Sequence, residues 1–230
     1  MSSRVFLIWD SLTLLQAHNR PKNAVSLGVE LGIPTIPKLI ANFISERVQH
    51  HHRTRHAIPF TGRIKIFHSA VATFVSPSDL SGIGSMRREV IRATPAWLQG
   101  TPRYDCIFVS TDETKDGMLS MDVGRVYCFF SFTHMDGQFF SCALIHWFDR
   151  LADQPNEVNG MWMVRPSYLD DGSSNLAVID VDSIVRAAHL LPIFGNKSIS
   201  HDIAPQNSLD YFDTFYVNCF ADHHAFELIH

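Results

Sequence analysis

Alternation of apolar and polar residues dominates the chain after Gly62 and predicts a mainly β structure. The clearest element is a hairpin, in which strands at residues 123–133 and 138–148 flank a turn at Met135, Asp136 and Gly137. A glycine-containing turn between two such runs is a strong hairpin signal. We expect this hairpin to form the centre of the sheet. Further strands are predicted at residues 63–75, 104–110, 161–164 and 176–180.

Helical spacing appears towards both ends of the chain. Residues 36–48 carry apolar side chains at steps of three and four, with Pro37 in the first turn, as is typical of an amphipathic helix. Near the C-terminus we predict a short helix around residues 183–187 and a longer one from Ser208 as N-cap. The apolar face of the longer helix is Leu209, Phe212, Phe215, Tyr216 and Cys219.

The predicted fold class is therefore α+β and mainly β. We expect a small partly open barrel or a strongly bent antiparallel sheet, with helices at the N- and C-terminal ends. The organisation predicted is an N-terminal helical and basic extension, residues 1–61, followed by a β-rich domain, residues 62–230.

Composition narrows the class of protein. With 46% hydrophobic and 18% charged residues, the chain resembles soluble globular proteins. The apolar stretch at residues 5–17 is interrupted by Asp10 and lacks a convincing cleavage site, so we do not expect a signal peptide. No run approaches the roughly 20 apolar residues of a membrane span. The four cysteines, which lie far apart without a Cys-x-x-Cys pair, are predicted to be buried free thiols in a reducing compartment.

The charge is distributed unevenly along the chain. Residues 1–103 hold 13 Lys and Arg against 5 Asp and Glu, a net charge of +8, whereas residues 104–230 hold 6 against 18, a net charge of −12. The first part is suited to contact with nucleic acid and the second would be repelled by it. The alternative is that the two parts neutralise each other within one folded unit.

The strongest nucleic-acid candidate is the basic cluster Arg87, Arg88 and Arg92. Arginine offers a planar fork of donors to phosphate, and each neutralised phosphate releases counterions. The alternative is that these arginines pair with acidic residues of the β-rich domain. Both interpretations remain open from the sequence.

Several phrases occur in a fixed order along the chain. Residues 63–112 read RIKIFHSAVATFVSPSDLSGIGSMRREVIRATPAWLQGTPRYDCIFVSTD, and SCALIHWF, GMWMVRP, AVIDVDSIVRAAHLLPIFG and NSLDYFDTFYVNCFADHHAFELI follow. In order and spacing they resemble the C-terminal region of Plavaka-type fungal transposases, relatives of the CACTA DNA transposons, over roughly Gly32 to Ile229. That region lies downstream of the RNase H-like core whose acidic residues hold two metal ions. The resemblance implies a nuclear, otherwise cytoplasmic, protein without that catalytic triad, whose partners are DNA, a chromatin protein or another transposase chain.

A weaker resemblance connects the chain with bromo-adjacent homology (BAH) modules. It rests on VGRV at residues 123–126, LIHWF at 144–148, WMVRP at 162–166 and AVIDV at 177–181, with Ser167 where such modules carry a glutamate. It implies an aromatic partner-binding set that can hold a methylated ammonium by cation–π contact. The set is Tyr104, Trp147, Phe148 and Trp162. The alternative for all four is core packing.

Two histidine clusters are candidate metal sites. Asp222, His223 and His224, like His50–His52, lack the i, i+4 or Cys-x-x-Cys spacing of zinc sites, so we expect end-capping or core hydrogen bonds for the first and a solvated loop for the second. Gly82 and Gly84 lack the third glycine of a dinucleotide fingerprint, and no P-loop or nucleophile elbow appears. No metal or cofactor is expected.

The sequence thus favours a non-catalytic, transposon-derived module that contacts DNA, chromatin or a partner protein. The alternative is a non-functional remnant of a decayed mobile element, and a third hypothesis is a zinc-dependent enzyme at Asp222, His223 and His224.

Overall fold

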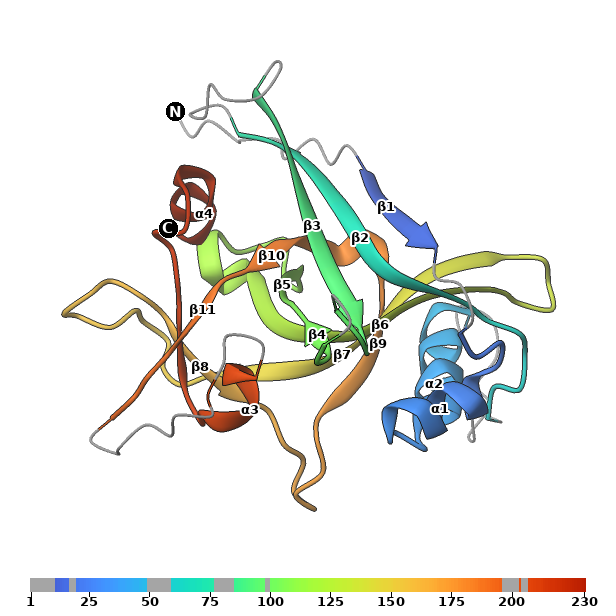
Figure 1. The fold of residues 1–230 in the computed structure, drawn as a ribbon. Coiled ribbons are helices and arrows are strands. Elements are labelled where there is room, and N and C mark those ends of the chain that lie inside the picture. Colours follow the sequence, from blue (N-terminus) through green and yellow to red (C-terminus); the bar gives the residue numbers. More distant parts are fainter. Residues whose placement is uncertain are drawn as a thin grey trace.

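The computed structural model describes residues 11–16, 20–48, 59–76, 85–97, 100–195, 203 and 207–230. These residues form a twelve-stranded antiparallel sheet that curls into an open half-barrel, with helices at both ends, which confirms the predicted fold class (Figure 1). The strands are β1 (Ser11–Gln16), β2 (Lys65–Val75), β3 (Met86–Thr94), β4 (Arg103–Tyr104), β5 (Cys106–Ser110), β6 (Met121–Thr133), β7 (Phe139–Arg150), β8 (Met163–Pro166), β9 (Leu176–Asp180), β10 (Ile184–Ala188), β11 (Leu190–Pro192) and β12 (Phe215–Val217). The helices are α1 (Ala24–Leu31), α2 (Ile36–Val48), α3 (Ser208–Tyr211) and α4 (His223–Ile229).

The β6–β7 hairpin lies at the middle of the sheet, as its alternation predicts. The main strand order is β11-β12-β8-β7-β6-β2-β3-β4. The hairpin turns where the sequence indicated: the His134 N–H donates to the Gln138 carbonyl at 2.8 Å, and Gly137 has a φ of 87°, which favours glycine. Phe129, Phe130 and Leu144 are fully buried.

A β-bulge interrupts the hairpin at Tyr127. Val126 lies opposite Ile145 and Cys128 lies opposite Leu144, so Tyr127 is an extra residue in the ladder. The other edge of β6 pairs with β5 before the bulge and with β2 after it. The bulge therefore lies where β6 changes neighbours, and a bulge bends its strand, which suits the curl of the sheet.

The inner face of the curled sheet holds one apolar cluster. It is built from β2, β3, β5, β6, β7 and β10, and includes Ile91, Ile107, Val126, Phe129 and Ile145. The outer face carries two further clusters. One lies beneath α1 and α2, and the other lies beneath β8, β12 and α4.

Helices α1 and α2 cover one part of the outer face. Helix α1 is capped at its N-terminus by Asn23, whose side chain accepts from the Ser26 N–H, and at its C-terminus by Gly32, which has a φ of 68°. Helix α2 has the predicted bounds and packs Phe43 edge-to-face against Phe140 of β7. Residues 24–43 and 64–144 share this cluster, so the predicted boundary between residues 61 and 62 does not separate two hydrophobic cores.

Two helix predictions near the C-terminus were wrong. Residues 184–188 form strand β10, which is buried throughout and pairs with β5. The helix from Ser208 ends after one turn, at Tyr211, and Phe215 begins strand β12 between β8 and β11. In both places the backbone pairs with strands far away in sequence, and this pairing overrides local helical spacing. The sequence analysis also assigned no element to the residues of β1, α1, β3, β11 and α4.

All four cysteines are free and buried, as predicted. Burial raises the pKa of Cys106 and of Cys128 to about 12, so both remain thiols at neutral pH. The longest helix of the described residues, α2, has 13 residues, which is too short to cross a bilayer. The apolar stretch at 5–17 falls mostly outside the described residues, and His50–His52, Gly82 and Gly84 lie wholly outside them.

Candidate functional site

The predicted basic cluster lies on strand β3, and strand alternation divides it between two faces. Arg88 and Arg92 lie opposite Thr73 and Ser69 of β2, whereas Arg87 lies opposite Phe74 on the other face. Phe74 belongs to the inner cluster, so Arg88 and Arg92 lie on the outer face of the sheet. Arg88 is exposed and Arg92 is partly buried. The structure therefore brings together only two of the three arginines.

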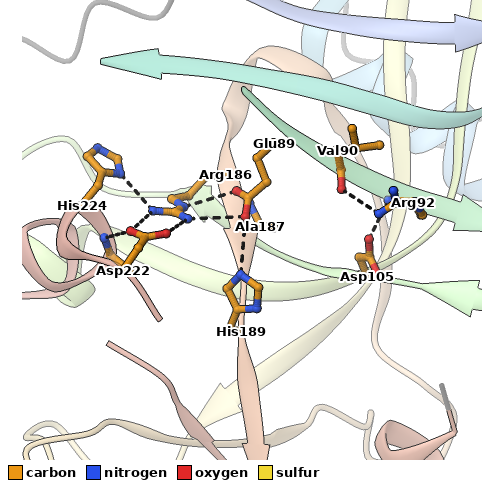
Figure 2. Close-up of polar contacts among 10 residues, drawn as sticks. Glu89, Val90, Arg92, Asp105, Arg186, Ala187, His189, Asp222 and His224 are labelled. Carbon is orange, nitrogen blue, oxygen red and sulfur yellow. Dashed lines mark hydrogen bonds and ion pairs between the residues drawn. The ribbon is translucent and has the colours of Figure 1, made fainter. Parts of the chain in front are cut away.

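Arg92 is joined on this face by residues that the sequence did not single out. The guanidinium carbons of Arg92 and Arg103 lie over the Trp97 ring, 4.4 and 5.6 Å from its centroid. Asp105 accepts from the Arg92 backbone N–H at 2.8 Å (Figure 2). It also accepts from Arg103 Nε at 2.8 Å. We call Arg88, Arg92, Trp97 and Arg103 the outer basic face. It carries three guanidinium groups and one carboxylate, Asp105, beside them.

The predicted aromatic set is not assembled into a cage. Phe148 and Trp162 are buried in the outer cluster beneath β8 and β12. Tyr104 and Trp147 pack against the inner cluster instead. Strand alternation puts Trp147 and Phe148 on opposite faces of β7. Core packing, the alternative interpretation, describes Phe148 and Trp162, while Tyr104 is half-buried against Tyr127 at 5.2 Å.

Asp222 and His224 belong to a buried ionic cluster around Arg186 of β10 (Figure 2). Arg186 is 1% exposed and donates to both Asp222 oxygens, at 2.8 and 2.6 Å. On its other side it meets Glu89 of β3 at 3.4 Å, and its guanidinium carbon lies 4.7 Å from the centroid of the Phe74 ring. Two carboxylates thus surround one buried guanidinium.

The ionic cluster also holds helix α4 against the sheet. Asp222 is the N-cap of α4 and accepts from the Ala225 N–H at 2.8 Å. His224 Nδ1 lies 3.1 Å from Arg186 Nη1, and its ring stacks on Phe74 at 4.5 Å. His223 points elsewhere, to Glu227 at 3.3 Å. Asp222 and His224 contact Arg186 while His223 contacts Glu227, so the three residues do not face a common metal position. Within the described residues no group of three or more His, Cys, Asp or Glu side chains is placed to hold a metal ion.

The protonation states in the ionic cluster follow from these contacts. The hydrogen bonds from Arg186 hold the pKa of Asp222 well below its usual range. For Glu89, burial raises the pKa, but the hydrogen bonds from His189, Arg186 and the Ala187 N–H together lower it. Burial and the Arg186 charge lower the pKa of His224, whereas the hydrogen bond to Glu89 raises that of His189. At neutral pH both carboxylates are charged and His224 is neutral.

A cleft of about 540 Å³ opens on the outer face, beside α3. Arg125 of β6 and His146 of β7 lie opposite each other across the strands, before the bulge. Tyr127, Tyr168 and Phe212 add aromatic rings to the lining. The charged side chains lining the cleft are Arg125, Arg165, Asp149, Asp210 and Asp213.

Two side chains at the floor of the cleft, those of His146 and Arg125, are held in place by hydrogen bonds. His146 Nε2 lies 2.7 Å from the Ser167 carbonyl, which only accepts, so Nε2 carries the proton and donates. Burial lowers the pKa of His146 and favours this neutral form. Arg125 donates to Asp210 through Nη1 at 2.5 Å and Nη2 at 3.1 Å. The cleft thus combines a guanidinium held in place by hydrogen bonds with walls of aromatic side chains, an arrangement suited to binding a ligand.

No family model, curated protein or solved structure compared with the chain matches it. The cleft and the ionic cluster are therefore interpreted from their own geometry.

The residues that sequence reasoning missed share one signal. Arg125 and Arg186 each interrupt a run of apolar, strand-forming residues, VGRVYCFF and SIVRAA. A charged side chain at such a position must be paired when the strand is buried. The pairing of the two arginines with Asp210 and Asp222, which lie 85 and 36 residues away in sequence, carries no local signal.

Proposed function

We propose that this chain is a non-catalytic module that binds the phosphate backbone of nucleic acid through the outer basic face. The observation that carries the proposal is the arrangement of Arg92 and Arg103 over Trp97. Arg88 lies on the same face of β3, with Val90 between it and Arg92. Guanidinium groups bind phosphate oxygens, and an aromatic ring beside them can stack on a base.

Charge and resemblance support the same function. The outer basic face belongs to the part of the chain with a net charge of +8. The resemblance to a region downstream of a transposase catalytic core agrees with an accessory role in holding DNA. Asp105 weakens the positive field locally, so we expect binding to be weak, independent of sequence and strongly dependent on salt.

The test is the salt dependence of binding to a short duplex. Arg88→Ala combined with Arg92→Ala should reduce the slope of log K against log salt by about 2, since each phosphate contact contributes about 0.9. The backbone N–H of residue 92, which Asp105 accepts from, is retained in this variant. Lys115→Ala combined with Arg165→Ala is the matched control, because it removes the same charge from exposed sites elsewhere.

If both double variants lower the salt slope equally, the effect comes from net charge alone, which would contradict the proposal. An unchanged slope in the β3 variant would do the same. No measurable binding of the unaltered protein at low salt would favour a remnant of a mobile element without a preserved partner.

A further inference from the structure

Arg125 is buried with less compensation than a charged side chain usually receives. Its side chain is 8% exposed, and Nε, although buried, has no hydrogen-bond acceptor. Tyr104 and Tyr127 place their ring centroids 5.8 Å from the guanidinium carbon. Buried donors are normally satisfied, and an unsatisfied one in a native structure calls for an explanation. Among the described residues Arg125 has one charged partner, Asp210, which accepts from the other two nitrogens.

That partner reaches Arg125 from the rim of the cleft. Asp210 is 58% exposed and belongs to α3, a single helical turn of four residues. Its two oxygens meet Nη1 and Nη2 in the side-by-side geometry that arginine forms with a free carboxylate. An exposed carboxylate on one turn of helix is a contact that can open without disturbing the sheet.

We propose that the cleft is a binding site for a small organic carboxylate with a planar or aromatic body, and that Asp210 occupies the carboxylate position when no ligand is bound. Arg125 would hold the carboxylate of the ligand through Nη1 and Nη2, the two nitrogens that Asp210 now occupies. Tyr127, His146, Tyr168 and Phe212 would contact its body. The cleft volume of about 540 Å³ lies within the range of small-molecule sites, roughly 300–1,000 Å³. This site does not depend on the function proposed for the outer basic face.

The charges that line the cleft favour a ligand with one negative charge over a polyanion. Apart from the Arg125–Asp210 pair, the cleft is lined by Asp149, Asp213 and Arg165, with a net charge of −1. A polyanion such as a nucleic-acid strand would meet the two unpaired carboxylates, and like charges repel at this range. A compact phosphate would satisfy Arg125 but leave the aromatic walls unused.

The proposal predicts that Asp210 competes with the ligand. A site whose competent form is populated one-tenth of the time binds about tenfold more weakly than the open site. We therefore expect Asp210→Asn to bind benzoate at least about tenfold more tightly than the unaltered protein, in calorimetric titrations. Asp213→Asn is the matched control, because it removes the same charge from the same rim without touching Arg125. We expect less than about threefold tightening there.

A second measurement identifies the atoms involved. Benzoate should shift the guanidinium resonances of Arg125 in both the unaltered protein and Asp210→Asn, because its carboxylate takes the position at Nη1 and Nη2. Arg125→Lys in the Asp210→Asn background should abolish binding while thermal unfolding reports whether the fold is kept. Lysine retains the charge and loses the fork.

Four results would overturn the proposal. They are equal benzoate affinity in Asp210→Asn and the unaltered protein, equal tightening in Asp210→Asn and Asp213→Asn, inorganic phosphate binding as tightly as benzoate, and a single-stranded oligonucleotide displacing benzoate from the cleft.

Discussion

Two arginines are buried in the sheet, and each is paired with a carboxylate from the C-terminal part of the chain. Arg186 is 1% exposed and is enclosed by Asp222, Glu89, His224 and the Phe74 ring. Among the described residues Arg125 has a single charged partner, Asp210. Nε lacks a hydrogen bond in both arginines, but in Arg186 it lies 3.4 Å from a Glu89 oxygen. The comparison teaches that burial of an arginine does not indicate its role. The exposure of its partner and the number of its charged partners are more informative.

The largest expected difference is in stability. Arg186→Met keeps similar volume but leaves Asp222 and Glu89 without their cation, and breaking a buried pair in this way costs about 3–5 kcal/mol of unfolding free energy. Arg125→Met leaves only Asp210, which is 58% exposed and can be hydrated, so we expect a loss of about 1–2 kcal/mol. Urea unfolding measures both. Equal losses would refute the distinction between the two arginines.

A smaller difference is expected for the carboxylate partners. Asn is as good an N-cap as Asp, so Asp222→Asn retains the bond to the Ala225 N–H and loses only its charge beside Arg186. We expect a loss of about 1–3 kcal/mol, the value of a hydrogen bond to a charged group, together with faster amide exchange in α4. For Asp210→Asn, we expect a loss below about 1 kcal/mol. If Asp210→Asn is the more destabilising variant, the Arg125 pair is the structural one.

The smallest effect is a pH dependence, to which two histidines on the Arg186 side contribute in opposite directions. The pKa of His224 is lowered by burial and by Arg186, so the folded state resists a proton that the unfolded chain accepts, and stability falls as the pH drops below about 6.5. The raised pKa of His189 acts oppositely: its contribution is complete below about 6.5 and is lost as the pH rises through the folded value. Asp222, with its depressed pKa, loses its contribution only below about pH 4.

Two variants separate these contributions. His224→Gln should flatten the fall of unfolding free energy between about pH 7 and 5, while His189→Gln should steepen it, because the opposing term is removed. Denaturant unfolding at several pH values measures the slopes. A steeper fall in His224→Gln would show that this ring is charged in the folded protein.

The fold was predictable where the spacing of apolar residues fitted only one type of secondary structure. The alternation on either side of Gly137 leaves no helical alternative, and the steps of three and four in residues 36–48 leave no strand alternative. Residues 208–219 satisfied both patterns, because Leu209, Phe212, Phe215 and Cys219 fit a helix while Phe215, Val217 and Cys219 fit a strand. Pairing with β8 and β11 decided between them, and that pairing is not written locally.

The candidate sites were less predictable than the fold. Alternation within MRREVIRAT separates Arg87 from Arg88 and Arg92, but only after β3 is recognised as a strand. The cleft requires Arg125 and Asp210 to meet across 85 residues, and the ionic cluster requires Arg186 to meet Glu89 across 97. Contacts between residues so far apart in sequence depend on which strands become neighbours in the sheet.

The bulge at Tyr127 makes this tyrosine behave as an inserted residue. Because Val126 pairs with Ile145 and Cys128 with Leu144, the chain on both sides of Tyr127 keeps the facing of an uninterrupted ladder. A gene that lost this codon would encode a β6 in which every remaining side chain still faces its present side. Deletion of Tyr127 would therefore remove an aromatic ring from the cleft while the inward and outward facing of the rest of β6 is kept.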